Sequence, residues 1–178
     1  LSAAVLAAMT HMVLKNFETE IKFSPSNFLT TLNHMLYGKL AGNFLTAFYG
    51  VIDLSKNKIL YGNAGHHPPF KVDLANKTFE PISSRGKILG LIPDLYYEEK
   101  EISFVPGNRL VLFTDGISEH SSKDRRRKYD EHLLEADILN SVLLDTQSAS
   151  DFLINSSRSH TKTEDFEDDV TLLLIDRI

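Results

Sequence analysis

Apolar residues recur along this chain first at helical spacing, then at strand-like spacing and then at helical spacing again, and this order limits the folds it can adopt. Helices precede a run of strands, and two further helices precede one last strand. This order favours an α+β domain with a mainly antiparallel sheet, and strands that are apolar on both faces require a covering layer on each side. The predicted helices cover residues 1–17, 25–40, 130–144 and 148–160, and the predicted strands cover a hairpin over 43–65 and residues 70–74, 97–104, 109–114 and 170–175.

The length and composition fit one ordinary globular domain. The chain has 178 residues, of which 42% are hydrophobic and 24% charged, so we predict a single domain over 1–178. No apolar run approaches the ~20 residues that span a bilayer, and no basic segment precedes an apolar start. We therefore expect a cytoplasmic protein with no membrane span in this segment.

Two features of the composition exclude classes of chemistry. The chain has no cysteine, which excludes disulfides and thiolate metal sites, so a metal ion would need oxygen or imidazole ligands. The net charge of −5 argues against nucleic acid as the main partner, because binding a phosphate backbone requires a concentrated basic face.

Acidic residues stand at the ends of two predicted strands. Residues 109–114 run into Asp115 and Gly116, and the last strand follows Asp168 and Asp169. If the two strands are antiparallel neighbours, these three carboxylates share one sheet edge. Carboxylates gathered there repel one another unless a cation lies between them, and oxygen ligands suit Mg²⁺ or Mn²⁺, while Gly116 would permit a sharp turn. A common turn dipeptide and a solvated acidic loop explain the same residues, so both interpretations stay open.

Three stretches carry a family resemblance: TAFYGVIDLSKNKILYGNAGHHPPF, LGLIPDLYYEEKEISFVPGNRLVLFTDGISE and DDVTLLLI. In order and spacing they resemble the bacterial SpoIIE/RsbU-like branch of the metal-dependent, PPM-type serine/threonine protein phosphatases, over nearly the whole chain. The resemblance implies an α-β-β-α sandwich of two mainly antiparallel sheets flanked by helices, with two Mn²⁺ or Mg²⁺ ions. By motif position it makes Asp115 and Asp168 metal ligands, and Asp169 ranks below them.

One element of that family is absent from the sequence. A strand and an Asp-x-Ser-Gly-His-Gly-like element precede, in the family, the helix that here begins LSAAVLAAM, and the aspartate of that element bridges both metals. Either an upstream segment exists beyond these residues, or the protein is a degenerate, inactive relative. We favour the first, because Leu1 falls within a helical pattern that has no N-cap, while Asp115 and Asp168 are both present. We therefore expect an N-terminally truncated phosphatase domain, lacking its first strands and first metal motif, that is inactive by itself.

Two loops contain further candidate residues. NAGHHPP, residues 63–69, resembles a loop of the family, and we predict a structural loop in which His66 is hydrogen-bonded, with a ligand role for His66 and His67 as the alternative. Arg85, next to Gly86, stands where the family has a flexible loop. It is interpreted either as a phosphate-steering side chain or as a surface arginine.

Residues 123–128, KDRRRK, form the only basic run. The run is interpreted either as a solvated loop or as a docking patch for an acidic phosphoprotein. A nucleic-acid role is disfavoured, because no aromatic residue is interleaved with the basic ones.

The resemblance implies a metal-dependent protein serine/threonine phosphatase. Two metals about 3.5–4 Å apart would activate a water molecule for in-line attack, so no catalytic side chain beyond the metal-activated water is expected. The implied substrate is a phosphorylated, STAS-type anti-sigma-factor antagonist in bacterial partner switching. The first two helices could form a homodimer surface, although core packing explains their apolar stripes equally well. The alternative function is a catalytically inactive interaction domain that keeps the phosphatase fold.

Overall fold

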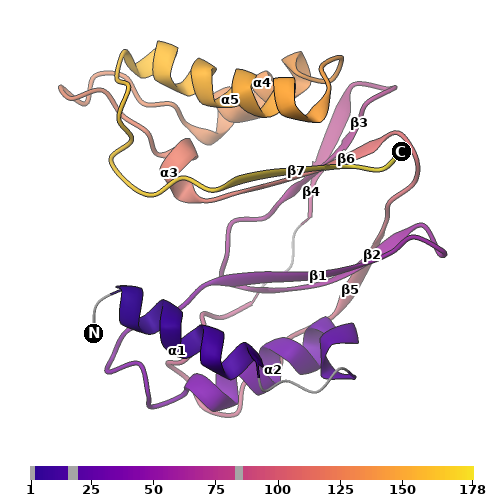
Figure 1. The fold of residues 1–178 in the computed structure, drawn as a ribbon, viewed down its shortest axis with the longest axis vertical. Coiled ribbons are helices and arrows are strands. Elements are labelled where there is room, and N and C mark those ends of the chain that lie inside the picture. The colour runs from indigo at the N-terminus through magenta and orange to yellow at the C-terminus, as the bar shows by residue number, and fades with distance from the viewer. Residues whose placement is uncertain (1–2, 16–19, 83–85) are drawn as a thin grey trace. The chain divides into compact units, whose positions relative to one another are not determined.

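The structure is a computed structural model that describes residues 3–15, 20–82 and 86–178. The chain divides into two compact units, which are Leu1–Pro68 with Ser83–Phe104, and Pro69–Ile82 with Val105–Ile178. The first unit contains α1 (Ala3–Lys15), η1 (Ile21–Phe23), α2 (Pro25–Leu36), β1 (Ala47–Asp53), β2 (Lys58–Ala64) and β5 (Lys100–Ser103) (Figure 1). The second unit contains β3 (Phe70–Asp73), β4 (Thr78–Pro81), β6 (Asn108–Phe113), α3 (Asp115–Ser118), α4 (Glu131–Asn140), α5 (Thr146–Thr161) and β7 (Leu172–Asp176).

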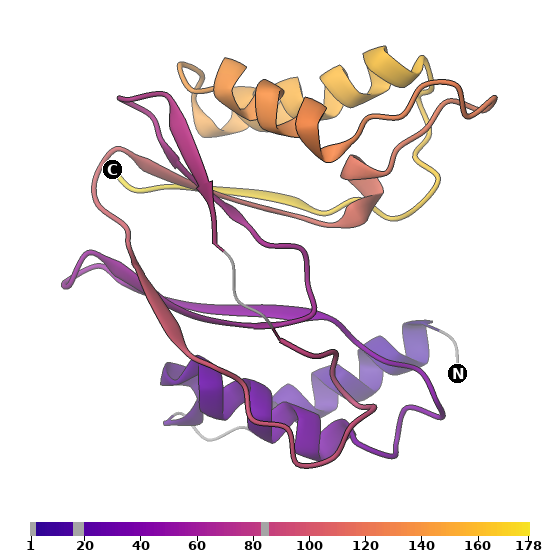
Figure 2. The same ribbon diagram turned by 180° about the vertical axis from the view of Figure 1, so that it is seen from behind.

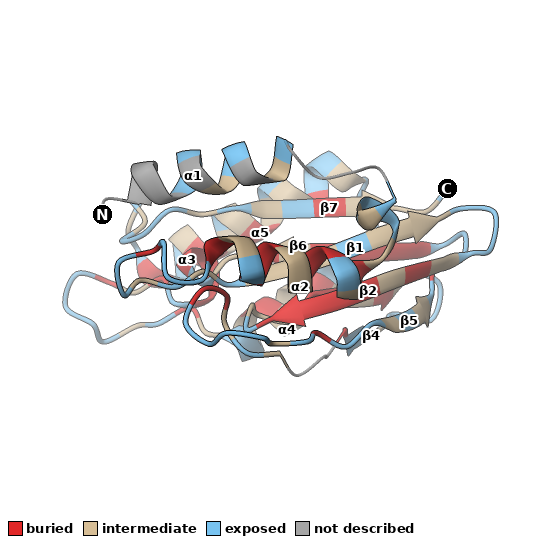
Figure 3. Cartoon of the chain, turned by 90° about the horizontal axis from the view of Figure 1, so that it is seen from below, coloured by how far each residue is buried: buried red, intermediate tan, exposed pale blue. Residues whose placement is uncertain are grey.

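The first unit is an antiparallel sheet of order β1-β2-β5 with α1 and α2 on one face (Figure 1). Helix α2 begins as predicted, with Pro25 in its first turn and the Ser24 hydroxyl accepting a hydrogen bond from the Asn27 amide at 3.3 Å. Its apolar stripe is buried against the sheet and appears red in Figure 3. The stripe consists of Phe28, Leu29, Leu32 and Leu36.

The second unit is an antiparallel sheet of order β4-β3-β6-β7, and α4 and α5 cover one of its faces (Figures 1 and 2). Both helices have aspartate N-caps: Asp130 accepts from the Leu133 amide at 3.1 Å, and Asp145 accepts from the Ser148 amide at 2.9 Å. Buried apolar residues of β3, β6, α4 and α5 form the core between sheet and helices.

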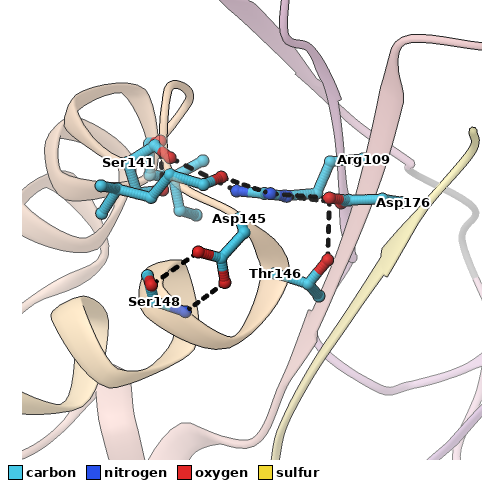
Figure 4. A network of polar contacts seen from close by, with 8 residues as sticks. Arg109, Ser141, Asp145, Thr146, Ser148 and Asp176 are labelled. Carbon is cyan, nitrogen blue, oxygen red and sulfur yellow. Dashed lines mark hydrogen bonds and ion pairs between the residues drawn. The ribbon is translucent and has the colours of Figure 1, made fainter.

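A buried arginine holds together the end of the β6–β7 pair at which β6 begins and β7 finishes (Figure 4). Arg109, 1% exposed, donates to both carboxylate oxygens of Asp176, from Nε at 2.6 Å and from Nη2 at 2.8 Å. Its Nη2 also donates to the Leu144 carbonyl at 2.9 Å, and Thr146 donates to Asp176 at 2.8 Å. The bidentate pair therefore joins the two strands to the connection between α4 and α5.

The α+β class with two antiparallel sheets and helices is confirmed, and several element boundaries differ from the prediction, including α2, which ends at Leu36 rather than at residue 40. Strand β5 begins at Lys100 rather than at residue 97, because the Tyr97 amide bonds the Thr30 hydroxyl on α2 instead of a strand. Helix α4 ends at Asn140 rather than at residue 144. The sequence did not predict the short helix α3 or the edge strand β4. Strand β4 ends in Pro81, a residue that a sheet tolerates at an edge strand. No helix in the described part of the chain is long and apolar enough to cross a bilayer.

Candidate functional site

The predicted pairing of the two strands with acidic ends is confirmed. Strands β6 and β7 are antiparallel neighbours, with Phe113 opposite Leu172. The pairing continues past the strands, since the Thr114 amide donates to the Thr171 carbonyl at 3.0 Å and the Thr171 amide donates to the Thr114 hydroxyl at 2.9 Å. The end of β6 and the start of β7 therefore meet at one sheet edge, beside α3 (Figures 1 and 2).

A pocket of about 260 Å³ lies at this edge, within the second unit. Its lining residues are Asp115, Gly116, Glu119, His120, Glu167 and Asp168. The structure thus brings Asp115 and Asp168 to the same pocket, as the sequence predicted, and adds the carboxylates of Glu119 and Glu167. The four acidic residues are exposed, so they meet water rather than the core.

Asp169 contributes to the edge through its backbone and does not line this pocket. Its carbonyl accepts a hydrogen bond from the Thr114 hydroxyl at 3.3 Å, and its amide donates to the Asp168 carboxylate at 2.8 Å. The second bond orients one oxygen of Asp168 toward the backbone. These two contacts link the Asp169 backbone to Thr114 and Asp168.

Gly116 is required for a reason that differs from the predicted one. The chain does not turn on this residue but enters the short helix α3, in which Gly116 is buried. A Cβ atom there would lie 2.5 Å from the Asp169 carbonyl oxygen and 3.1 Å from Cγ2 of Val170. The absence of a side chain lets the segment around Asp168 approach the start of α3.

The buried imidazole of His120 lies behind the acidic pocket. His120 is 1% exposed; its Nδ1 lies 2.9 Å from the Ser157 hydroxyl on α5, and its Nε2 lies 3.3 Å from the Asp165 carbonyl. A carbonyl only accepts, so Nε2 carries the proton and Nδ1 accepts from Ser157. Burial lowers the pKa of His120, Arg158 lowers it further, and the Asp165 carbonyl and Glu167 oppose that shift. The neutral ring thus ties the segment before Asp168 to α5.

Aromatic contacts hold the same segment. The Phe166 ring lies 4.3 Å from the His120 ring, centroid to centroid, and the Arg158 guanidinium lies 5.4 Å from the Phe166 centroid. Sequence reasoning missed His120, because no motif marks it. The available signal was the pair of small polar residues Ser157 and Thr161, which are four apart on the buried face of α5.

The donor types at this pocket suit a hard cation, since carboxylate oxygens are the ligands that Mg²⁺ and Mn²⁺ prefer. Among the described residues, however, no group of three or more histidine or acidic side chains is arranged to hold a metal ion. Asp115 and Asp168 carry oxygen donors of this type, and both line the pocket.

Among the other predicted site residues, His66 does not line this pocket. His66 belongs to the first unit, in a loop where its amide donates to the Asn63 side chain at 2.7 Å and its carbonyl accepts from the same side chain at 2.8 Å. The His66 Nδ1 lies 3.2 Å from the Thr46 hydroxyl. Arg85 lies outside the described residues.

Comparisons with known proteins agree with the fold and with the sequence resemblance. The phosphoserine phosphatase RsbU of Bacillus subtilis is 28% identical over 89% of this chain, which spans 47% of the length of RsbU. The SiaA-PP2C domain of Pseudomonas aeruginosa has a similar structure, with a TM-score of 0.77, 13% identity, and coverage of 95% of this chain and 66% of that one.

A second solved structure is also similar to this chain. The phosphatase domain of the cell fate determinant SpoIIE from Bacillus subtilis, in its Mn-presoaked form, has a TM-score of 0.62 at 16% identity, covering 99% of this chain and 74% of that one. The family model described as Stage II sporulation protein E (SpoIIE) matches residues 1–178. The chain therefore belongs to the SpoIIE family, in the SpoIIE/RsbU-like branch of the PPM-type serine/threonine phosphatases.

Proposed function

We propose that this chain forms the later part of the metal site of a protein serine/threonine phosphatase. The observation that carries the proposal is the meeting of β6 and β7 at one edge, where Asp115 and Asp168 line the same pocket. Membership of the SpoIIE family supports it, and so does the similarity to RsbU, which is named a phosphoserine phosphatase. The chain spans about half of RsbU, so the activity of the whole protein is part of the proposal.

Asp115 and Asp168 are the proposed ligands of Mn²⁺ or Mg²⁺, with two ions expected. Bound ions of this kind lower the pKa of water and neutralise phosphate oxygens. The protein's own residues position these ligands: Gly116 admits the Asp169 backbone, and His120 holds the segment that leads to Asp168. The expectation that an aspartate from an Asp-x-Ser-Gly element completes the site stays a prediction.

The proposed substrate is a phosphoserine or phosphothreonine of a regulatory protein. RsbU and RsbP of Bacillus subtilis are both named phosphoserine phosphatases. A phosphorylated STAS-type anti-sigma-factor antagonist in partner switching is the specific candidate that the resemblance implies. A cytoplasmic location and a homodimer remain predictions of the same origin. The inactive interaction domain is not favoured, because the named relatives are phosphatases.

Activity of the full-length protein tests the proposal. We expect Mn²⁺-dependent release of phosphate from a phosphoserine peptide, and loss of that release in Asp115→Asn and in Asp168→Asn. Asp169→Asn is the matched control, because it removes another exposed carboxylate of the same edge, one that does not line the pocket. Equal loss in all three variants, or in none, would contradict the assignment of the ligands.

A further inference from the structure

The basic residues 123–128 belong to a structured hairpin that immediately follows the acidic pocket. Ser121 and Lys128 form an antiparallel bridge, and the Ser122 amide donates to the Arg127 carbonyl at 2.8 Å. The Arg127 amide donates back to the Ser122 hydroxyl at 3.0 Å. These contacts give the basic run, here called the basic hairpin (121–128), a defined shape rather than that of a free loop.

The single acidic residue of the hairpin, Asp124, accepts hydrogen bonds from other residues of the turn. Asp124 accepts from the Ser122 hydroxyl at 2.6 Å and from the Arg126 amide at 3.1 Å. The Ser122 bond, with the Arg126 amide, keeps the pKa of Asp124 below its ordinary value, so this carboxylate is ionised and bound within the turn. Five basic side chains and this one acid give residues 123–128 a local charge of +4 in a chain of charge −5.

The basic side chains at the tip face solvent. Lys123, Arg125 and Arg126 are exposed, and the Arg126 side chain is 86% accessible. The Arg126 Nε also lies 3.8 Å from the Asp124 carboxylate, an exposed contact that a bidentate arginine–carboxylate pair with a partner can replace.

The base of the hairpin adjoins the pocket. The Tyr129 amide donates to the carbonyl of His120, which lines the pocket, at 2.7 Å. Lys128 Nζ lies 3.7 Å from the carboxylate of Glu119, another lining residue. Arg125 is four positions after Ser121, so the tip lies at most about 14 Å from the base.

We propose that the basic hairpin binds acidic side chains that flank the phosphorylated residue of a protein substrate. The inference rests on the proposed phosphatase function and adds a substrate class to it. An extended peptide advances ~3.3 Å per residue, so the reach of the hairpin corresponds to acidic residues within about four positions of the phosphoserine.

An acidic protein segment fits this surface better than a nucleic acid does. Residues 123–128 contain no aromatic side chain on which bases could stack. In a peptide with one phosphate and a few acidic side chains, the acidic side chains can pair with the basic side chains of the hairpin.

The test uses the full-length protein with the triple substitution Lys123→Glu, Arg125→Glu and Arg126→Glu. Three substrates are compared: a phosphoserine peptide with acidic residues within four positions, the same peptide with those residues replaced by alanine, and p-nitrophenyl phosphate. We expect kcat/KM for the acidic peptide to fall about tenfold or more, while the alanine peptide and the aryl phosphate change less than about twofold. The preference of the unsubstituted protein should shrink as salt rises from about 0.1 to 1 M, which shortens the screening length from roughly 10 to 3 Å.

The matched control changes the same charge elsewhere. Lys39, Lys56 and Lys77 are exposed, and reversing all three should leave the peptide preference intact. Equal loss on all three substrates, or no loss on any of them, would overturn the docking proposal. If the unsubstituted protein hydrolyses none of the substrates, the phosphatase proposal fails instead. Fluorescence anisotropy of the labelled acidic phosphopeptide then decides the docking proposal alone: tenfold weaker binding by the triple variant supports it, and equal binding overturns it.

Discussion

The imidazole of His120 lies 2.9 Å from the hydroxyl of Ser157, Nδ1 to Oγ, and this contact joins the acidic pocket to helix α5. The other ring nitrogen reaches the Asp165 carbonyl, three residues before Asp168. One buried side chain therefore controls how the segment carrying a proposed ligand is held. The position of Asp168 depends on this contact as well as on the β6–β7 ladder.

Removing the imidazole should destabilise the protein. In His120→Ala, the Ser157 hydroxyl and the Asp165 carbonyl lose a partner, and the free energy of unfolding should fall by about 2 kcal/mol. Urea denaturation followed by circular dichroism measures the change. His34→Ala is the control: His34 is exposed, and its substitution should change stability by less than about 0.5 kcal/mol. Equal effects of the two substitutions would show that the buried contact contributes nothing.

The same residue predicts how stability depends on pH. The folded-state pKa of His120 is below its ordinary value of 6.5 because the ring is buried. The unfolded chain therefore binds a proton first as the pH falls, so stability should decrease from about pH 6.5 down to the lowered pKa and then level off. The Asp165 carbonyl and Glu167 oppose the lowering of this pKa and Arg158 adds to it, so these groups set how far the window extends. His120→Gln should show a smaller decrease over this range in pH-dependent urea titrations; an unchanged slope would assign the effect to other groups.

The ion pair of the buried Arg109 with the half-buried Asp176 should matter more than an exposed pair. Asp176→Ala leaves Arg109 without its carboxylate partner, and we expect a loss of about 3 kcal/mol in the free energy of unfolding. Glu101→Ala, which breaks the exposed pair with Lys58, should cost less than about 1 kcal/mol. Arg109 holds the pKa of Asp176 below its ordinary value of 3.8, so this stabilisation is present above about pH 4 and is lost as the pH falls through the lowered pKa. Similar losses in both variants would contradict the role given to burial.

Gly116 should tolerate no side chain. In Gly116→Ala the new methyl group would lie 2.5 Å from the Asp169 carbonyl oxygen, so the segment 168–170 has to move, at a cost of about 1–3 kcal/mol. Gly50→Ala, where the nearest atom lies 3.3 Å away on a side chain, is the milder control. Thermal unfolding of both variants measures the difference, and a Gly116→Ala protein as stable as the unsubstituted one would show that the approach seen at this residue is not required.

How much of this structure can be predicted from the sequence depends on whether a feature leaves a local sequence pattern. Helix α2 and the β6–β7 pair were predictable, because Ser24-Pro25 is a strong start signal and the two strands are strongly apolar. The convergence of Asp115 and Asp168 followed from that pairing. The roles of His120 and Gly116 did not, because both depend on tertiary neighbours that carry no periodic or motif signal.

Direct measurement of metal binding tests the central claim, which is that Asp115 and Asp168 bind one metal centre. Isothermal titration calorimetry with Mn²⁺ on the full-length protein should show binding that is lost or strongly weakened in Asp115→Asn and in Asp168→Asn, and retained in Asp169→Asn. This readout does not depend on any substrate. Mn²⁺ affinity that is unchanged by substituting Asp115 and Asp168 would contradict the account.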